Sequence, residues 1–458
     1  MVPDSDRIRN LSEAFISDLS TRQVAFNYSG LAEQRIGMEC FFTHDAGVGG
    51  RLRTEPEDFI VEELSILPEE CADGENTAAI VRARYWETNR LIREFARRLR
   101  VSRRKIMFAG TKDRRAVTTQ LFVFGAPMFQ VRSISLADVD FLDIYPTKSN
   151  IGMGDLLGNR FSIKLKSLEM EMQEALETCT NVKRQLDSIG GFPNYFGVQR
   201  FGAVRPITHL VGKCMTRKEP ENAVVTYLCR TSPFEDPDTT RAREKLASSM
   251  NIPEALHDFP KELSFEKAMM NHLVKNPDDY VGALGQLPQN LLMMFIHAYQ
   301  SYLFNRMLSE RMRRGIPFNI PSEGDLVLKM DKNGLPDHDN WIKADNRNIP
   351  RLTELIGQRK AFISATLYGM ESEFAGGEQG EIEAMIIEQE GVKGRDFILS
   401  EYDKLGSRGT RREILASVKD FKMSQEEDAI QFDFALTKGC YATTLLREFM
   451  KAEELTKY

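Results

Sequence analysis

Residues 108–120, Phe-Ala-Gly-Thr-Lys-Asp-Arg-Arg-Ala-Val-Thr-Thr-Gln, contain the side chains best suited to chemistry. One carboxylate, Asp113, lies among Lys112, Arg114 and Arg115. Nearby cations favour the charged form of a carboxylate. A charged oxygen nucleophile beside a cationic surface suits a reaction on a nucleic acid. Taken alone, the segment also fits a solvated turn between two strands, in which Asp113 pairs with an arginine.

The charge of the chain is distributed unevenly. The 458 residues have a net charge of −6. Between Arg82 and Arg115, however, there are thirteen basic residues and three acidic ones, a local net charge of +10. Such asymmetry indicates a phosphate-binding face on an otherwise acidic protein. A merely solvated helix face usually mixes glutamate with arginine, and this segment barely does.

Strands are expected on both sides of Asp113, over 105–109 and 117–124. Another strand is predicted over 77–84, and a strand, a proline turn and a second strand over 47–62. Near 156–166, a turn at Gly158-Asn159 is expected to lead into a strand that alternates Phe161, Ile163 and Leu165. These segments predict a sheet around the Asp113 loop.

A helix is predicted to begin at a Thr88 N-cap and to end near Arg100. Its buried stripe is Leu91, Phe95 and Leu99. The cations on its other sides project outward together, and we expect such a surface to follow an RNA backbone without reading its sequence. The residues assigned to this role are Arg90, Arg93, Arg97 and Arg104.

The order of elements indicates an α/β (α+β) protein whose sheet domain is interrupted by an insertion. The middle, 203–405, is mostly helical in pattern, and its acidic stretch at 373–390 is expected to be solvated. A lone strand at 429–436 and a helix at 442–451 return to the sheet. The predicted division is 1–192 for the first part of the catalytic domain, 193–405 for the insertion and 406–458 for the second part. Residues 1–20 are predicted to form a helix or a loosely attached arm.

Several classes of protein are disfavoured by composition. Six cysteines and six histidines are dispersed without the spacing of a zinc site or a disulfide framework. No apolar run approaches 18 residues, so no membrane span is expected. The amino terminus lacks a signal-peptide pattern, which favours a cytoplasmic protein. Nothing such as a coiled coil predicts obligate assembly, so we expect a monomer.

Six motifs, in order along the chain, resemble the tRNA pseudouridine synthase D (TruD) family. They are Arg53-Thr-Glu-Pro-Glu-Asp-Phe-Ile-Val-Glu62, Phe108–Gln120, Gly158-Asn159-Arg160-Phe161, Pro193–Gly202, Gln300-Ser-Tyr-Leu-Phe-Asn305, and Lys438-Gly-Cys-Tyr-Ala-Thr443 with Leu446-Arg-Glu448. The length of the middle region, and Gly-Thr-Lys-Asp in place of Gly-Gln-Lys-Asp, resemble the archaeal and eukaryotic branch.

The resemblance implies a pseudouridine synthase fold, with a bent, largely antiparallel mixed sheet and a large, mainly helical α+β insertion domain. It implies conversion of uridine to pseudouridine in RNA, typically at position 13 of tRNA, without metal or organic cofactor. By its place in the motif, Asp113 matches the catalytic aspartate of the family.

The resemblance also suggests which residues bind substrate. Phe161 is the first candidate to stack under a flipped base, although it could simply be core, and Asn159 is expected at a polar edge of the base. Arg53 is expected to pair with Asp113 or a phosphate, and Phe59 to be pocket wall or core. Lys112 and Arg114 flank the catalyst. A second wall is expected from Asn194 to Phe201, with Gln199 and Arg200 reaching the RNA, although a packing turn is almost as plausible for that segment.

Three chemical paths remain open for the carboxylate. Asp113 could attack C1′, as in retaining glycosidases, add to the base, or remove a ribose proton to give a glycal. Two other functions fit the residues less well. One is a non-catalytic RNA-binding or RNA-chaperone protein on the same fold, and the other is an N-glycosidase that releases uracil.

Overall fold

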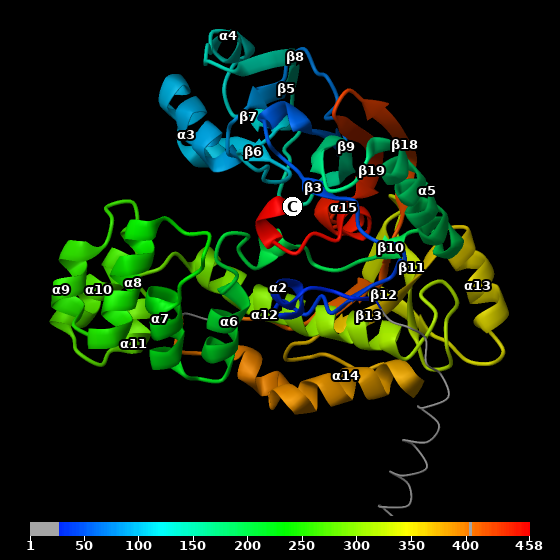
Figure 1. The fold of residues 1–458 in the computed structure, drawn as a ribbon. Helices are drawn as coiled ribbons and strands as arrows, with labels where there is room; N and C mark the ends of the chain where they lie inside the picture. The colour runs from blue at the N-terminus through cyan, green and yellow to red at the C-terminus, as the bar shows by residue number, and fades with distance from the viewer. Residues whose placement is uncertain (1–26, 403–404) are drawn as a thin grey trace, which may run out of the picture.

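The computed structural model describes residues 27–402 and 405–458 (Figure 1). Its main element is a nine-stranded mixed sheet. The strands are β3 (Gly49–Arg51), β4 (Phe59–Ser65), β5 (Asn76–Arg84), β6 (Ile106–Phe108), β7 (Val117–Phe124), β8 (Val139–Thr147), β9 (Leu156–Leu168), β18 (Val418–Glu426) and β19 (Ala429–Thr437). Their order is β18-β19-β9-β4-β7-β5-β8, with β3 added at β9 and β6 at β7. Only β4 and β7 pair in parallel, which confirms the predicted mixed, largely antiparallel sheet.

The central strand β9 alternates inward and outward side chains, as predicted. Ile163 and Leu165 are fully buried and Phe161 nearly so, and Phe161 lies between Val61 of β4 and Phe434 of β19 in the register. The predicted turn at Gly158-Asn159 is wrong, because both residues belong to β9. Gly158 is needed for close strand approach, since a Cβ there would lie 2.1 Å from the carbonyl oxygen of Leu436.

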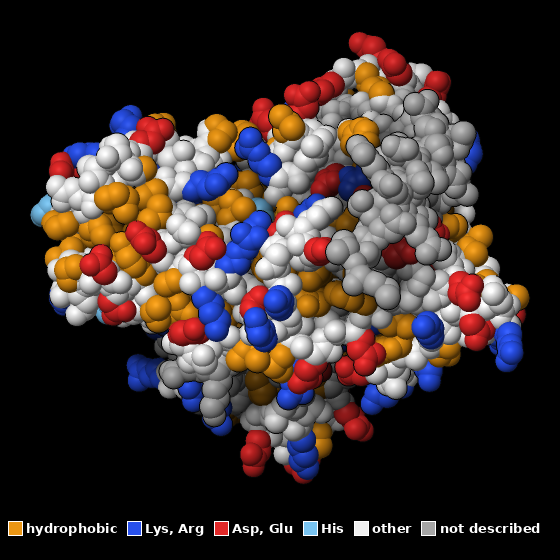
Figure 2. Space-filling view, turned by 90° about the horizontal axis from the view of Figure 1, so that it is seen from below, with side chains coloured by type: hydrophobic (Ala, Val, Ile, Leu, Met, Phe, Trp, Pro, Cys, Tyr) orange, Lys and Arg blue, Asp and Glu red, His pale blue; other side chains and the backbone are white. Residues whose placement is uncertain are grey.

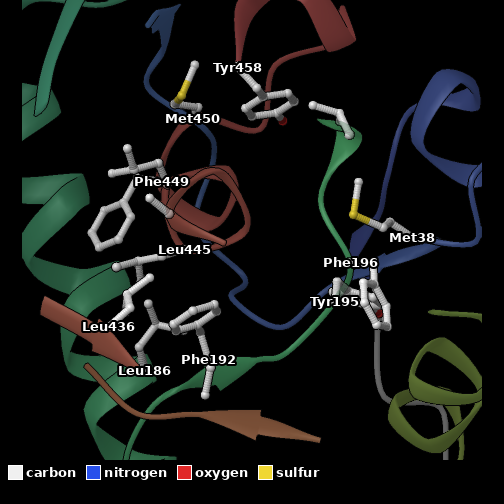
Figure 3. Packing of buried hydrophobic residues seen from close by; sticks show 14 of the residues in the cluster. Met38, Leu186, Phe192, Tyr195, Phe196, Leu436, Leu445, Phe449, Met450 and Tyr458 are labelled. Atoms are coloured by element: carbon white, nitrogen blue, oxygen red, sulfur yellow. The ribbon is translucent and has the colours of Figure 1, made fainter. Parts of the chain in front are cut away.

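Two helices cover the inner face of this sheet, α5 (Met172–Ile189) and α15 (Ala442–Met450). Figure 3 shows Leu445 of α15 facing Leu186 of α5, Leu436 of β19 and Phe192, while Met450 of the same helix lies on the side of Tyr458. Burial of such side chains is the main favourable term in folding. The carboxyl-terminal strand and helix are therefore an integral part of the sheet domain.

The helix α3 (Thr88–Leu99) packs against β7 through Phe95, whose ring centroid lies 5.5 Å from that of Phe122 and 5.3 Å from that of Phe124. The predicted N-cap is wrong by one residue. Glu87 caps the helix by accepting hydrogen bonds from the backbone of Asn89 and Arg90. Thr88 is buried instead, where its hydroxyl is used by the Asp113 loop.

The middle of the chain combines helices with a second sheet. The helices are α6 (Thr208–Thr216), α7 (Pro220–Cys229), α8 (Pro237–Ser249), α9 (Ile252–Asp258), α10 (Ser264–Lys275), α11 (Tyr280–Leu284), α12 (Gln289–Arg313), α13 (Ile349–Gly357) and α14 (Gly377–Glu390). The sheet is antiparallel with the order β12-β11-β13-β16, formed by β12 (Pro336–Lys343), β11 (Leu326–Met330), β13 (Ala361–Leu367) and β16 (Thr410–Glu413). The long helix α12 contributes to two cores, with Phe304 on the sheet side and Tyr299 among the helices. It thereby joins the two halves seen in Figure 1.

The acidic stretch at 373–390 is only partly solvated: four of its six glutamates are exposed as predicted, and two are not. Most of it forms α14, and Glu383 and Glu390 of this helix are buried. Glu383 pairs with Arg411 at 2.9 Å, and Glu390 pairs with Lys213 at 2.7 Å and Arg306 at 2.9 Å. Pairing with cations from distant segments allows these carboxylates to be buried.

The predicted lone strand near the end has a hairpin partner, because β18 precedes β19 and pairs with it. The strand β18 is at the edge of the sheet and is largely polar, so it lacks the hydrophobic alternation of β19. The predicted arm at residues 1–20 lies outside the described residues. The domain boundaries at 192/193 and 405/406 stay a prediction, and β16 pairs with β13 of the second sheet.

Figure 2 views the molecule from below, where basic and acidic side chains alternate over the described surface. Exposed basic side chains are most frequent on and around α3 instead. Twelve of the thirteen basic residues between Arg82 and Arg115 are exposed, and only Lys112 is buried. We call these twelve side chains the basic surface. They are Arg82, Arg84, Arg90, Arg93, Arg97, Arg98, Arg100, Arg103, Arg104, Lys105, Arg114 and Arg115.

Candidate active site

A cavity of about 370 Å³ lies above the central strands β4 and β9. Eight of the residues predicted from the sequence line it: Arg53, Phe59, Lys112, Asp113, Asn159, Phe161, Gln199 and Arg200. Its remaining wall includes Thr111, Phe196, Arg412 and the segment from Gly439 to Thr443. The cavity therefore brings together residues from the first part, the middle and the end of the chain.

The Asp113 loop connects β6 to β7 and is fixed at several points. The backbone N–H of Lys112 donates to Oγ1 of Thr88 at 2.8 Å. Gln120 donates to the carbonyl of Gly110 at 3.2 Å. The buried ammonium of Lys112 pairs with Glu63 at 2.7 Å. These contacts hold the loop while the side chain of Asp113 keeps 58% of its surface exposed.

Arg53 is the direct partner of the Asp113 carboxylate. Its Nη2 lies 3.1 Å from Oδ2 of Asp113, and its guanidinium lies 4.1 Å from the ring centroid of Phe59. Burial lowers the pKa of Arg53, and the charge of Asp113 opposes that shift. The backbone of Arg53 is left-handed, with φ of 58°, which is uncommon for a residue with a side chain. The Nε atom of Arg53 is buried without a hydrogen-bond partner.

The floor of the cavity is aromatic on one side and polar on the other. The ring of Phe161 stacks on Phe434 with 5.4 Å between centroids and meets the edge of Phe59 at 6.2 Å. Phe161 is therefore part of the core and part of the cavity lining at once. Two residues earlier on the same strand, Oδ1 of Asn159 is buried and has no hydrogen-bond partner.

The opposite wall is held by two polar contacts. Oγ1 of Thr443 donates to Oε1 of Gln199 at 3.0 Å. This contact leaves Nε2 of Gln199 buried and without a partner. Arg412 lies 4.2 Å from the ring centroid of Phe196 and donates to the carbonyl of Gly439 at 2.9 Å. Arg412 thus connects the 196–200 segment to the loop before α15.

Some predicted residues lie elsewhere. Asn194 is fully buried behind the wall, where it bonds Glu413 and accepts from Arg412 at 2.7 Å. Arg114 lies outside the lining, with its guanidinium 4.5 Å from the ring centroid of Tyr85. The four arginines assigned to the RNA backbone are exposed on or just after α3: Arg90, Arg93, Arg97 and Arg104. Arg97 pairs with Glu94 at 2.6 Å, and Arg90 lies 5.0 Å from the ring centroid of Trp86.

Phe196 falls within the predicted second wall, whereas sequence reasoning missed Arg412 and Tyr441 as cavity residues. Tyr441 falls within one of the six family-like motifs, which was the available signal. Arg412 stands in a segment without any recognisable pattern.

Within residues 27–402 and 405–458, no group of three or more His, Cys, Asp or Glu side chains is arranged to hold a metal ion. In that same part of the chain, no helix has both the length and the apolar character needed to cross a bilayer.

The mixed sheet, the exposed carboxylate and the adjoining basic surface favour an enzyme that acts on a nucleic acid. The comparisons with known proteins narrow that class. Residues 35–449 match the family model described as tRNA pseudouridine synthase D (TruD). The chain belongs to the TruD family, which confirms the resemblance stated on its motifs.

Two relatives and one solved structure are similar to this chain over nearly its whole length. The "Probable tRNA pseudouridine synthase D" of Methanococcoides burtonii is 37% identical over 430 residues, covering 92% of this chain and 98% of the relative. The protein of the same name from Methanosarcina mazei is 39% identical over 431 residues, with the same coverage. A crystal structure of a TruD protein from M. mazei superposes with a TM-score of 0.79 at 38% identity, covering 92% of this chain and 98% of that one. The predicted fold class is thereby confirmed.

Proposed function

We propose that this chain converts uridine to pseudouridine in tRNA, at position 13 as the resemblance implies, with Asp113 as the catalytic carboxylate. The observation that carries the proposal is the polar lining around Asp113. Four buried polar atoms of the cavity residues have no protein partner: Nε of Arg53, Oδ1 of Asn159, Nε2 of Gln199 and Nε of Arg200. Unpaired buried polar groups cost about 1–3 kcal/mol each. These atoms are shielded from solvent in the free protein, so a bound nucleotide would supply the missing partners once the lining side chains reorient toward it.

The reaction is an isomerisation whose atoms balance without a cofactor. The N1–C1′ bond of the uridine breaks, and C5 of the detached uracil bonds to C1′. The hydrogen on C5 leaves as a proton, and N1 gains one. There is no net oxidation or reduction. We propose that the Asp113 carboxylate, paired with Arg53, acts on C1′, on the base or on a ribose proton, and each of these paths uses the same residue.

Two of the unpaired atoms suit the edge of uracil. That edge presents an oxygen acceptor, the N3–H donor and a second oxygen acceptor. Oδ1 of Asn159 accepts and Nε2 of Gln199 donates, so the pair matches N3–H and one neighbouring oxygen. In cytosine, N3 is an acceptor without a hydrogen, so the lone pairs of Asn159 Oδ1 and of cytosine N3 would face each other. A buried polar group that is left without a partner costs free energy, so this pair should favour uridine strongly over cytidine.

The same pair can hold the base before and after it turns. Rotation of uracil by 180° about its N3–C6 axis exchanges N1 with C5 and O2 with O4, while N3–H stays in place. Asn159 therefore keeps its partner, and Gln199 exchanges one carbonyl oxygen for the other. This explains how an enzyme that breaks the glycosidic bond retains the free uracil until C5 reaches C1′.

Because every cavity wall comes from one chain, we further propose that a monomer is sufficient for activity. Its work on tRNA is consistent with a cytoplasmic location.

The test of the function is release of tritium from tRNA that contains 5-tritiated uridine. We expect tritium release with a chelator present, because the C5 hydrogen leaves as a proton. Unlabelled tRNA should give a product of unchanged mass, because N1 gains one proton for the one lost from C5. Free uracil in the reaction would instead indicate an N-glycosidase. Tight, salt-dependent binding without tritium release at saturating protein would indicate an RNA-binding protein.

Gln199→Ala should lower kcat about 10-fold, because one hydrogen bond to the base is lost in a buried site. Substrates with 2-thiouridine or 4-thiouridine at the target test the exchange of oxygens. Sulfur is a weaker acceptor, so each thio substitution should slow the wild type to a similar extent and should leave Gln199→Ala unaffected. If only one thio substitution matters, Gln199 contacts a single orientation of the base.

A further inference from the structure

Tyr85 follows directly after β5 and is unusual in its backbone. Its φ is 62°, in the left-handed region that disfavours bulky side chains. The backbone N–H of Tyr85 donates to the carbonyl of Ala116 at 3.1 Å. Tyr85 therefore supports the far end of the Asp113 loop, as Arg53, also left-handed, contacts the carboxylate itself.

The side chain of Tyr85 is not needed for that support, because the hydrogen bond comes from the backbone. Tyr85 is 42% exposed, so part of its surface is open to a ligand while the rest is covered, Arg114 being one of the covering residues. Asparagine or glycine would adopt this backbone with less strain. An exposed aromatic ring kept in a disfavoured conformation at the rim of an active site calls for a functional reason.

The surroundings of the ring are cationic. The guanidinium of Arg114, the residue after Asp113, lies 4.5 Å from the centroid of Tyr85. The next residue, Trp86, donates through Nε1 to the carbonyl of Ala137 at 3.2 Å and has Arg90 at 5.0 Å from its ring centroid. Two aromatic–arginine pairs thus stand side by side where the basic surface meets the Asp113 loop. Aromatic rings set among cations are the usual elements of single-strand recognition.

We propose that Tyr85 is a stacking site for an unpaired nucleobase of the substrate RNA that neighbours the target uridine. The inference rests on the proposed function. The target itself belongs in the cavity, whose lining does not include Tyr85. Moving the target out of its stack leaves the neighbouring base with one bare face. A ring at the rim replaces the lost partner, and Arg114 backs the ring while reaching toward phosphate.

RNA binding by variants in the Asp113→Asn background tests this site, since turnover then does not interfere. We expect Tyr85→Ala to raise Kd about 10-fold and Tyr85→Phe to restore it. Phe129→Ala is the matched control, because Phe129 is a 72% exposed aromatic on α4 (Met128–Arg132), outside the basic surface. Its Kd should not change.

A set of RNAs, each with a single abasic site at a different position beside the target, identifies which base stacks on Tyr85. At one position, the abasic site should weaken binding of the Tyr85-containing protein about 10-fold and should leave Tyr85→Ala unchanged. The inference fails if Tyr85→Ala binds intact RNA normally, or if every abasic site weakens both proteins equally. Tyr85→Leu, which keeps the bulk of the side chain but not the π-face, should behave as Tyr85→Ala if the defect is in stacking.

The proposed function is tested separately by product formation in the wild type. A protein that forms pseudouridine but shows no Tyr85 effect overturns only the stacking site.

Discussion

Replacing Asp113 by asparagine should reduce pseudouridine formation by about 10³-fold or more and leave RNA binding intact. The amide has nearly the same shape but neither the charge nor the nucleophilicity of the carboxylate. Binding should be retained because the basic surface supplies most of the attraction for phosphate and Asp113 supplies none. Tritium release under single-turnover conditions measures the chemical step, and filter binding on the same RNA measures affinity.

A matched control separates this loss from a general effect of removing a carboxylate. Asp143→Asn makes the same chemical change at an exposed position of the edge strand β8, and we expect wild-type activity from it. Normal turnover by Asp113→Asn would show that another group carries the reaction. Equal loss of binding and turnover would indicate that the Arg53–Asp113 contact mainly shapes the RNA site.

The second large effect concerns stability. Replacing Glu33 by alanine should lower the free energy of unfolding by about 3 kcal/mol, since it removes one partner of a buried ion pair. Glu33 of α2 (Leu31–Gln34) pairs with Arg447 of α15 at 2.9 Å, and both are almost completely buried. Arg447 also donates to the carbonyl of Cys40 at 3.0 Å and contacts Glu448 at 3.2 Å. Guanidinium unfolding followed by circular dichroism measures the change.

Two further variants show whether burial causes this cost. Glu354→Ala removes one partner of an exposed pair with Arg351, for which we expect at most about 1 kcal/mol. The double variant Glu33→Leu with Arg447→Met should recover only part of the stability, because the buried Glu448 then loses its arginine and keeps only hydrogen bonds from Phe42 and Thr43. A loss for Glu33→Ala no greater than for Glu354→Ala would mean that Arg447 is satisfied by Glu448 alone.

Most of the site could be predicted because it is encoded locally. The Asp113 loop, Arg53 and the Asn159–Phe161 pair each belong to a short motif on a strand or a turn, and all line the cavity. The strands that carry them have regular hydrophobic alternation, which is the most reliable signal in a sequence.

What could not be predicted depends on pairing across long separations in sequence. The ion pair between Lys112 and Glu63 was not predicted, because the two residues are 49 positions apart in the chain. Arg412 became part of the cavity through Asn194 and Gly439, and neither partner is near it in the chain. Glu383 and Glu390 looked solvated because the cations that neutralise them come from other elements. The turn expected at Gly158-Asn159 failed because glycine serves there for close contact, not for chain reversal.

The walls of the cavity also set a rule for protein synthesis. Residues 53–161 form one side, but the other side needs Arg412 and the segment from Gly439 to Thr443, and β9 lacks its neighbour β19 until residue 437 has been made. The residues of the basic surface are therefore translated long before the residues that complete the pocket. A nascent chain at that stage can attract tRNA but has nowhere to place a flipped uridine, so activity begins only after nearly the whole polypeptide has been translated.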